Sequence, residues 1–379
     1  MKVQKTIKRL KSEGMNNMAI PELLKTISGI KIESASDWEN FRRPEIVNLF
    51  SEYVYGVRPV KKPTDLNFSV KSSEKNYNDK KINCEKITIS FSDYSFDVFG
   101  FIPETETNKK LPAFIYVMHE FEENKSDIEN SFDCEYINFK ELFNRGYAIF
   151  VMHTSGVAPD WDHKLGRTKG VYTVFDRKPV SDNAWATISA WAWGASRVMD
   201  YIETKDCIDP ENVSVAGHSR GGKTALWCGA TDTRIKCAFS NNSGCTGAAI
   251  HRTKVGEHIK DINITDWFCK NYHKFNDNED MLPVDQHMLI ASMAPRLAYV
   301  SSSSEDEWAD PAAERLSCKM ASEAYELYNM TGAVLPDEED IEKDIAYHDG
   351  NIGYHVKTGK HSITHFDWKM YLDFLDLKK

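Results

Sequence analysis

Residues 213–227 decide the fold, and they read Val213-Ser214-Val215-Ala216-Gly217-His218-Ser219-Arg220-Gly221-Gly222-Lys223-Thr224-Ala225-Leu226-Trp227. The first four residues have the apolar character of a short strand, and the residues after Gly221 begin a helix. Between them lies G-x-S-x-G, the nucleophile elbow, whose sharp turn lifts the serine hydroxyl clear of the sheet edge. Glycines suit a corner at which bulkier residues would collide with the neighbouring strand and helix. The five-residue pattern alone is weak, but its strand–turn–helix context favours Ser219 as a nucleophile over a structural serine in a turn.

Length and composition are typical of an enzyme with one large core. The chain has 379 residues, 41% hydrophobic and 12% aromatic residues, a net charge of −10 and a pI near 5.7. We expect a single domain over residues 1–379, with residues 1–80 forming an N-terminal extension packed on it. The acidic balance argues against nucleic acid and anionic membranes as partners, although an acidic protein can still hold a local basic pocket.

The sequence predicts neither a membrane span nor a bound cofactor. No apolar run approaches the roughly 20 residues that cross a bilayer. The basic start, residues 1–11, lacks the apolar core of a signal peptide, which predicts a cytoplasmic protein unless a secretion leader has been trimmed. Eight scattered cysteines without a CxxC pair favour reduced, buried thiols over a disulfide framework or a zinc site. No metal is expected, and the oligomeric state is not predicted.

Strands alternate with helices along the chain, which predicts a mostly parallel central sheet covered by helices on both faces. Together with the elbow, this order indicates an α/β-hydrolase fold, a three-layer α/β/α sandwich. The expected strands are 86–92, 95–102, 111–118, 147–152, 213–216, 235–240, 296–301 and 353–357. Helices are expected from Ser36, whose spacing to Glu39 resembles a capping box, over 188–202, and from about Thr364. The acidic stretch 329–349 is expected to be an exposed loop.

A serine hydroxyl is a poor nucleophile until a base takes its proton. In this fold the chain order is serine, acid, histidine, and the histidine follows the last strand. Four histidines lie late enough: His348 in the acidic loop, His355 within the last strand, His365 at the start of the closing helix, and His361 between strand and helix. We therefore expect His361 to be the base, the alternative being a surface histidine in a mobile loop.

The acid should follow the strand 296–301. There the chain reads Ser304-Glu305-Asp306-Glu307-Trp308-Ala309-Asp310-Pro311, with four carboxylates in six residues. Most of these carboxylates belong to a solvated turn, and the residues alone leave the identity of the acid open.

These motifs and five further segments resemble carbohydrate esterase family fifteen, the glucuronoyl esterases, in its bacterial branch. The resemblance is carried by residues 217–227, Asn242-Ser243-Gly244-Cys245, Leu282-Pro283-Val284-Asp285-Gln286-His287-Met288, Glu305-Asp306-Glu307-Trp308-Ala309-Asp310-Pro311, Gly359-Lys360-His361 and Asp367-Trp368, and upstream by Asp37-Trp38 and Arg42-Arg43-Pro44-Glu45-Ile46. It covers most of the chain, and S-R-x-G-K together with W-x-D-P is far more specific than the elbow alone.

The resemblance implies an α/β-hydrolase that cleaves the ester between a glucuronic acid carboxyl on xylan and a lignin alcohol. It implies Ser219 as nucleophile, His361 as base and Arg220 as a group that holds the oxyanion. Three further positions resemble those that bind the uronate sugar: Lys223, Glu257 and Trp308.

Elementary chemistry is consistent with most of these roles. Arg220, beside the nucleophile, can place a cationic donor where negative charge develops, although it can equally be a surface arginine paired to a carboxylate. Lys223 lies one helical turn after Ser219 and can face the same cleft, or be an ordinary exposed lysine. Trp308 can stack on a sugar, or be a core tryptophan. The sugar-binding role of Glu257 is implied by the resemblance alone.

The sequence departs from the family pattern at Asn242. In some members of the family that this chain resembles, a glutamate occupies the position of Asn242. Asparagine cannot stabilise an imidazolium as a carboxylate does. By the same resemblance, other bacterial members take the acid from the later loop, two residues before the tryptophan that is Trp308 here. We therefore expect Asp306 to be the acid, with Glu305 second.

The sequence thus predicts a serine esterase acting on esters of (4-O-methyl-)glucuronic acid, as in xylan–lignin linkages or smaller uronate esters. One alternative is an acetyl xylan esterase or other carbohydrate O-acetyl esterase on the same scaffold. The other is a hydrolase-fold protein that binds sugar without turnover, against which the intact Ser219, His361 and acidic segment argue.

Overall fold

The structure is a computed structural model that describes residues 20–104, 109–160, 167–175, 181–253, 255–263, 266–337 and 341–379. The basic segment 1–11, and with it the expectation about a leader, lies outside the described residues. In the described part of the chain, no helix is long and apolar enough to span a membrane. All eight cysteines are free and seven of them are buried, as the scattered spacing predicted.

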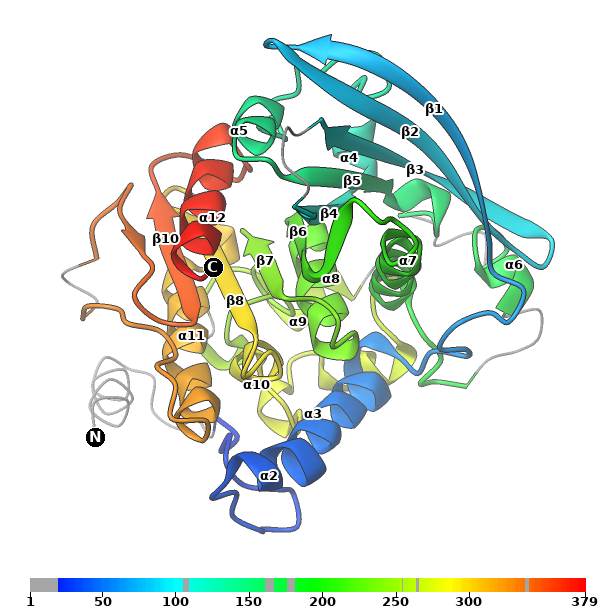
Figure 1. Ribbon diagram of the computed structural model, residues 1–379. Helices are drawn as coiled ribbons and strands as arrows, with labels where there is room; N and C mark the ends of the chain where they lie inside the picture. The colour runs from blue at the N-terminus through cyan, green and yellow to red at the C-terminus, as the bar shows by residue number, and fades with distance from the viewer. Residues whose placement is uncertain are drawn as a thin grey trace.

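One sheet runs through the molecule, and ten described strands form it in the order β1-β2-β3-β5-β4-β6-β7-β8-β10-β9 (Figure 1). The strands are β1 Asn67–Tyr77, β2 Lys80–Phe91, β3 Tyr94–Pro103, β4 Leu111–Met118, β5 Ala148–His153, β6 Ile208–His218, β7 Cys237–Asn241, β8 Leu297–Ser303, β9 Ala346–Tyr347 and β10 Ile352–Lys357. From β5 to β10 all neighbours in the sheet are parallel. The remaining pairs, at the two edges, are antiparallel.

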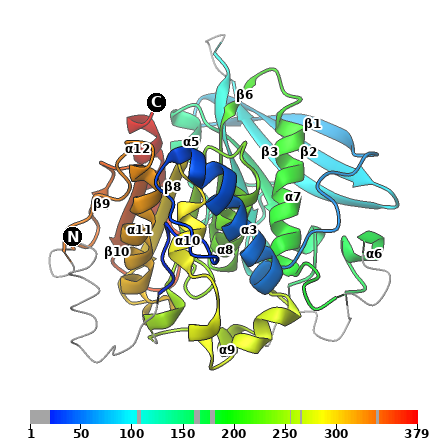
Figure 2. The same ribbon diagram turned by 90° about the horizontal axis from the view of Figure 1, so that it is seen from below.

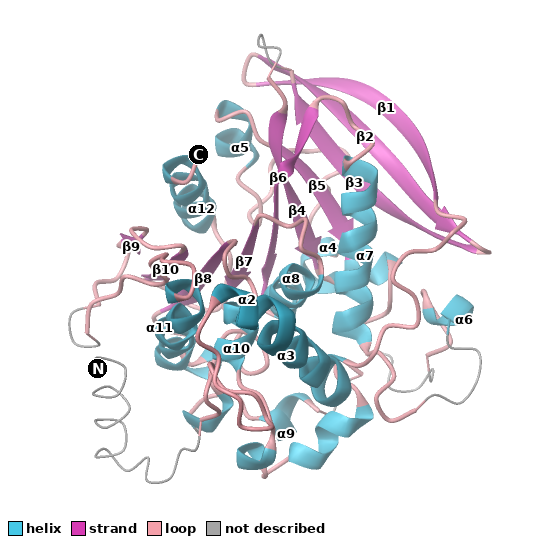
Figure 3. Ribbon diagram, turned by 60° about the horizontal axis from the view of Figure 1, so that its bottom comes forward, coloured by secondary structure: helices cyan, strands magenta, loops and turns pink. Residues whose placement is uncertain are grey.

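Helices cover both faces of this sheet. They are α2 Ala35–Asp37, α3 Arg43–Phe50, α4 Glu120–Glu123, α5 Phe139–Asn144, α6 Tyr172–Phe175, α7 Thr187–Ile202, α8 Arg220–Thr231, α9 Ile259–Ile262, α10 Gln286–Ala291, α11 Pro311–Glu326 and α12 His365–Leu377. On one face α7 and α8 lie side by side against the strands (Figure 3). On this same side α3 packs outside α8 and α10 (Figure 2).

The central strands are apolar along their whole length because each is buried on both faces. Successive side chains of a strand point to opposite faces, so β4 contributes side chains to two cores. Its Ile115 and Val117 join the core under α7 and α8, while Phe114 and Tyr116 join the core under α5 and α12. These two cores and the sheet between them confirm the α/β-hydrolase sandwich.

The N-terminal region differs from the expectation in two ways. The first helix among the described residues starts at Ala35, because Ser34 caps it. The Ser34 hydroxyl accepts from the Asp37 backbone N–H at 3.1 Å and donates to the Asp37 carboxylate at 2.8 Å. The pattern at Ser36 is therefore not the cap. In addition β1, which the sequence did not predict, pairs with β2 as an edge strand of the main sheet. Most of its residues are exposed, which removes the apolar alternation on which strand prediction depends.

Candidate active site

Ser219 lies between β6 and α8 in a backbone conformation that few residues other than glycine adopt. Its φ is 55° and its ψ is −122°, and such strain persists only where surrounding structure holds it. The Ser219 N–H donates to the Asn241 carbonyl at 2.8 Å, which ties the turn to β7. A Cβ at Gly217 would lie 2.3 Å from the Gly221 carbonyl carbon, and one at Gly221 would lie 2.7 Å from the Val117 oxygen. The two glycines are thus needed for the close approach of strand and helix.

His361 and Asp306 come together from two loops, one before α12 and one after β8. The His361 Nδ1 lies 2.6 Å from the Asp306 Oδ2. Because a carboxylate only accepts, Nδ1 carries the proton and Nε2 keeps a lone pair. Burial pushes the pKa of Asp306 upward, but the hydrogen bonds from His361 and Asn242 outweigh it and hold this pKa below its ordinary value. Asp306 is therefore an anion at neutral pH beside a histidine whose Nε2 can accept a proton.

Asn242 supports the acid from the position where the family resemblance places a glutamate in other members. Its Nδ2 donates to the same Asp306 Oδ2 at 2.8 Å, and its Oδ1 accepts from the Ser303 hydroxyl at 3.2 Å. Asn242 thus contributes a hydrogen bond where a glutamate would contribute a charge. Of the two carboxylates considered as the acid, Asp306 makes the contact with His361, whereas Glu305 is exposed.

Arg220 is the first residue of α8, and two side chains that the sequence gave no reason to select hold it. Its Nε lies 3.1 Å from the Asp160 Oδ2, and its guanidinium carbon lies 5.2 Å from the centre of the Trp267 ring. The Trp267 indole N–H donates to the other Asp160 oxygen at 2.8 Å. Burial raises the pKa of Asp160, and the positive charge of Arg220 opposes this shift. The arginine is thus paired to a carboxylate, but to a buried one that fixes it beside the nucleophile.

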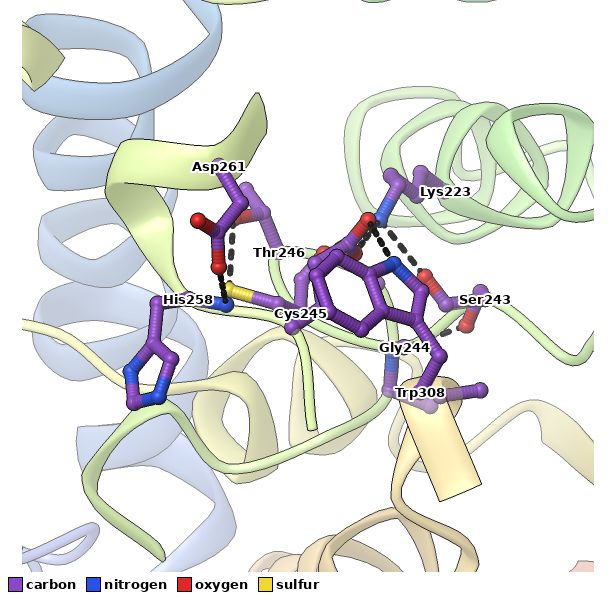
Figure 4. Close-up of polar contacts among 12 residues, drawn as sticks. Lys223, Ser243, Gly244, Cys245, Thr246, His258, Asp261 and Trp308 are labelled. Atoms are coloured by element: carbon purple, nitrogen blue, oxygen red, sulfur yellow. Dashed lines mark hydrogen bonds and ion pairs between the residues drawn. The ribbon is translucent and has the colours of Figure 1, made fainter. Parts of the chain in front are cut away.

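Lys223, Glu257 and Trp308 form a continuous row of polar contacts, which we call the uronate row after the role that the family resemblance implies for these positions. The Lys223 ammonium donates to the Glu257 Oε2 at 3.0 Å, and the Trp308 indole N–H donates to the Glu257 Oε1 at 3.1 Å. Lys223 also donates to the carbonyls of Ser243, at 2.7 Å, and Cys245 (Figure 4). These three partners match the three N–H donors of an ammonium. Lys223 therefore holds Glu257 and the turn at 243–245, while the half-exposed Trp308 ends the row.

Gly256 allows the loop before Glu257 to approach the Trp308 loop. Its φ is +69°, and a Cβ there would lie 2.5 Å from the Trp308 carbonyl oxygen. The Glu257 N–H donates to that same oxygen at 2.8 Å. The backbone contact sets the distance at which the Glu257 carboxylate can reach the indole N–H, so the two side chains are placed by their main chains.

Glu314, in α11, is a buried carboxylate under the site that the sequence did not single out. It accepts from the backbone N–H groups of Ser243 and Gly244, both at 2.9 Å, and from the Ser302 hydroxyl at 2.6 Å. Burial outweighs these hydrogen bonds and raises its pKa to about 8. Glu314 thereby fixes the turn that presents Asn242 to Asp306 on one side and the Ser243 carbonyl to Lys223 on the other.

Comparison with known proteins shows the family to which this chain belongs. The model of the family described as glucuronyl esterase, fungi, matches residues 132–330. Carbohydrate esterase MZ0003, from an unknown prokaryotic organism, is 33% identical over 389 residues, covering 94% of this chain and 89% of that protein. The chain belongs to the glucuronoyl esterase family. As a member, it is a carboxylic ester hydrolase. The family model ends before His361, so the contact of His361 with Asp306 is an observation independent of that match.

Solved structures of the glucuronoyl esterase family superpose on nearly the whole chain. A glucuronoyl esterase from Solibacter usitatus has a TM-score of 0.86 at 30% identity, covering 95% of this chain and 98% of that one. A promiscuous esterase of carbohydrate esterase family 15, from a marine bacterial metagenome, has a TM-score of 0.85 at 31% identity, covering 97% and 98%. Among named relatives, 4-O-methyl-glucuronoyl methylesterase 1 of Wolfiporia cocos is 26% identical, covering 93% of this chain and 78% of that protein.

Proposed function

We propose that this glucuronoyl esterase cleaves esters of the glucuronic acid carboxyl group through an acyl-enzyme on Ser219. The observation that carries the substrate assignment is the uronate row, which starts on the helix of the nucleophile and ends in an exposed indole. In a uronate ester the reacting carbonyl is the sugar's own C6, so the ring must lie beside Ser219. The Trp308 face can then stack on the ring, and Glu257 can accept from its hydroxyls. The name of the Wolfiporia relative supports the same substrate class.

In the first step His361 Nε2 takes the proton of the Ser219 hydroxyl while Oγ attacks the ester carbonyl carbon. The carbonyl oxygen becomes an oxyanion. In this proposal its donors are the Arg220 backbone N–H, at the first turn of α8, and the Arg220 guanidinium. Asp306 stabilises the imidazolium that forms. Because Asp160 and Trp267 hold the guanidinium, little reorganisation is needed as the charge develops.

The two remaining steps return the enzyme to its starting state. The His361 imidazolium gives its proton to the alcohol oxygen as the C–O bond breaks, which releases the alcohol and leaves the glucuronoyl group esterified to Ser219. His361 then takes a proton from water, and the resulting hydroxide equivalent attacks the acyl carbon. Collapse of this second intermediate releases glucuronic acid, and the proton returns to Ser219 Oγ.

The test compares benzyl glucuronate with an acetylated xyloside on the same enzyme preparation. We expect kcat/KM to be at least about tenfold higher for the glucuronate, because an acetyl ester places only a methyl group beside the uronate row and gains neither stacking on Trp308 nor a hydrogen bond to Glu257. A preference for the acetyl ester would transfer the assignment to an acetyl esterase. Hydrolysis of neither ester would favour a sugar-binding protein without turnover.

A further inference from the structure

A second imidazole lies against the catalytic histidine. His218, the last residue of β6, is buried directly before Ser219. Its ring centre lies 4.5 Å from that of His361, with the two planes inclined at 48°. The His361 side chain is 43% exposed, and the solvent on its open side does not fix the orientation of the ring. Its ring therefore depends on two neighbours, the carboxylate of Asp306 at Nδ1 and the imidazole of His218.

The hydrogen bonds around His218 determine which of its nitrogens carries a proton. The His218 Nδ1 lies 2.7 Å from the Asn241 Oδ1. The Asn241 Nδ2 donates to Asp367 at 3.1 Å and to the Ser301 hydroxyl at 2.9 Å. Since a carboxylate only accepts, the amide nitrogen must face Asp367 and the amide oxygen must face His218. The proton of the neutral ring is therefore on Nδ1.

Burial, reinforced by the nearby His361, lowers the pKa of His218 to about 3, so the ring is neutral at physiological pH. For Asp367 burial acts upward, but His355 and Lys357 outweigh it and lower the pKa of the carboxylate to about 2. The Asp367 carboxyl at the end of this chain of hydrogen bonds is therefore ionised at physiological pH. It sets the orientation of the Asn241 amide and hence the tautomer of the His218 imidazole.

The same carboxylate anchors the loop that carries the catalytic histidine. The Asp367 Oδ2 accepts from the Thr364 backbone N–H at 2.7 Å and from its hydroxyl at 2.8 Å. The Lys357 ammonium, 2.9 Å from Asp367 Oδ2, also donates to the Ser362 carbonyl at 2.6 Å. Residues 362–364 directly follow His361. One buried charge thus ties down both the loop of the base and, through the amide, the imidazole on which the base rests.

We infer that His218 is a positioning residue of the esterase reaction: a neutral imidazole that supports the ring of His361 and is itself oriented by Asp367 through Asn241. The inference rests on the proposed function, in which His361 carries the proton. During catalysis His361 becomes a cation, and a neutral neighbour supports it without repulsion. The other ionisable groups facing His218 are Lys357 from β10 and His119 from the end of β4, whose ring centre lies 5.9 Å away.

The first test observes the tautomer without substrate. In the full-length protein with ¹⁵N-labelled histidine rings, the resonance that disappears in His218→Phe belongs to His218. We expect a neutral ring protonated at Nδ1 throughout pH 5–8. In Asp367→Asn the new amide can donate as well as accept, so Asn241 loses its fixed orientation and an Nε2-protonated form should appear. A wild-type His218 that is protonated at Nε2, or is cationic in this range, would overturn the inference.

The second test separates positioning from folding by kinetics. His218→Ala should lower kcat by roughly 10²-fold, the cost of a misplacement of about 1 Å in a reacting group, and leave KM within about threefold. His218→Phe keeps a flat ring against His361 but loses the Nδ1–H bond, and should lose about tenfold. The control is His287→Phe. His287 is another buried histidine, in α10, and its Nε2 lies 3.1 Å from the Pro21 carbonyl. The kcat of this variant should stay within about twofold of wild type.

A near-normal kcat in His218→Ala, or an equal loss of kcat in His287→Phe, would overturn the positioning role. The rates are measured on whichever ester the wild type hydrolyses best. A wild type that prefers acetyl esters would refute the proposed substrate but not the role of His218. A wild type without any esterase activity would refute both the proposed function and the positioning role, while the tautomer measurement would still report on the orientation of the ring.

Discussion

The residues proposed to cleave the ester and the uronate row both start at α8, Ser219 as its N-cap and Lys223 within it, and they end in opposite environments. The Ser219–His361 pair ends at Asp306, a carboxylate that is 4% exposed and receives two side-chain hydrogen bonds. The uronate row begins at the buried Lys223 and ends at Trp308, which is 56% exposed. The proposed function thus places bond cleavage on groups whose protonation is set by buried neighbours, and sugar recognition on a row whose outer end, Trp308, reaches solvent. Substitutions in the two regions should therefore be separable in their effects.

The largest effect should come from the nucleophile. Ser219→Ala should lower kcat by roughly 10⁶-fold on every ester, because removing one core member of a serine triad costs about as much as removing all of it. Steady-state hydrolysis of benzyl glucuronate and of an acetyl ester measures the loss, and circular dichroism checks the fold. Appreciable turnover by a preparation verified free of wild type would contradict the serine mechanism.

The next largest effect should come from the acid. Asp306→Asn should lower kcat by roughly 10⁴-fold, since an amide neither fixes the histidine tautomer nor stabilises the imidazolium. Glu305→Gln, one residue away and exposed, is the matched control and should stay near wild type. Asn242→Ala removes one hydrogen bond to Asp306 and should cost no more than about tenfold. If Glu305→Gln caused the large loss and Asp306→Asn a small one, the acid would lie in the expected loop but would be Glu305.

In the uronate row the effect should be smaller and should depend on the substrate. Lys223→Met removes the ammonium that holds Glu257, and losing such charged hydrogen bonds costs about 1.5–3 kcal/mol, or one to two decades in kcat/KM on benzyl glucuronate. The loss on an acetyl ester should be several-fold smaller. Lys236→Met, before β7 at the far end of the strands, is the control for a partly buried lysine. Equal losses on both esters would show that the two regions are not separable.

The smallest effect concerns stability, and it comes from Glu314, which supports both regions. Its pKa is about 8 in the folded state against an ordinary value of 4.5. Between these values the folded state binds more protons than the unfolded state, so the free energy of unfolding should fall as pH rises from about 5 to about 8. Glu314→Gln cannot titrate and should lose this part of the slope, on the order of 1–3 kcal/mol over the window. Urea unfolding at several pH values measures it, and parallel slopes in the two proteins would contradict it.

Sequence reasoning succeeded where function is encoded locally. The elbow needs glycines within five residues of Ser219, and β4 was predicted with its observed bounds because two buried faces make it apolar throughout. Chain order left four candidate histidines, and the place of His361 between the last strand and the closing helix selected it. Its contact with Asp306 joins two segments that each carried a recognisable signal.

What the sequence could not show depends on contacts between distant segments. Asp160 and Trp267 hold Arg220 from two separate loops, and nothing in either loop marks them. From the sequence, the Lys223 ammonium could be free to donate to a substrate. In the structure it donates to the carbonyls of Ser243 and Cys245, which lie about 20 residues further along the chain. The strand β1 consists mostly of exposed polar residues, so its pairing with β2 leaves no trace in the hydrophobic pattern.

The exposure of Trp308 gives the uronate row a built-in optical reporter. Six tryptophans are almost completely buried, and Trp267 is 7% exposed, so among the described tryptophans Trp308 is the one that a dissolved quencher such as iodide reaches readily. Its intrinsic fluorescence should respond when a sugar ring covers the indole. Titration of Ser219→Ala with a glucuronate ester would then give an affinity in the absence of turnover. The same titration with Trp308→Phe would give the background from the other indoles.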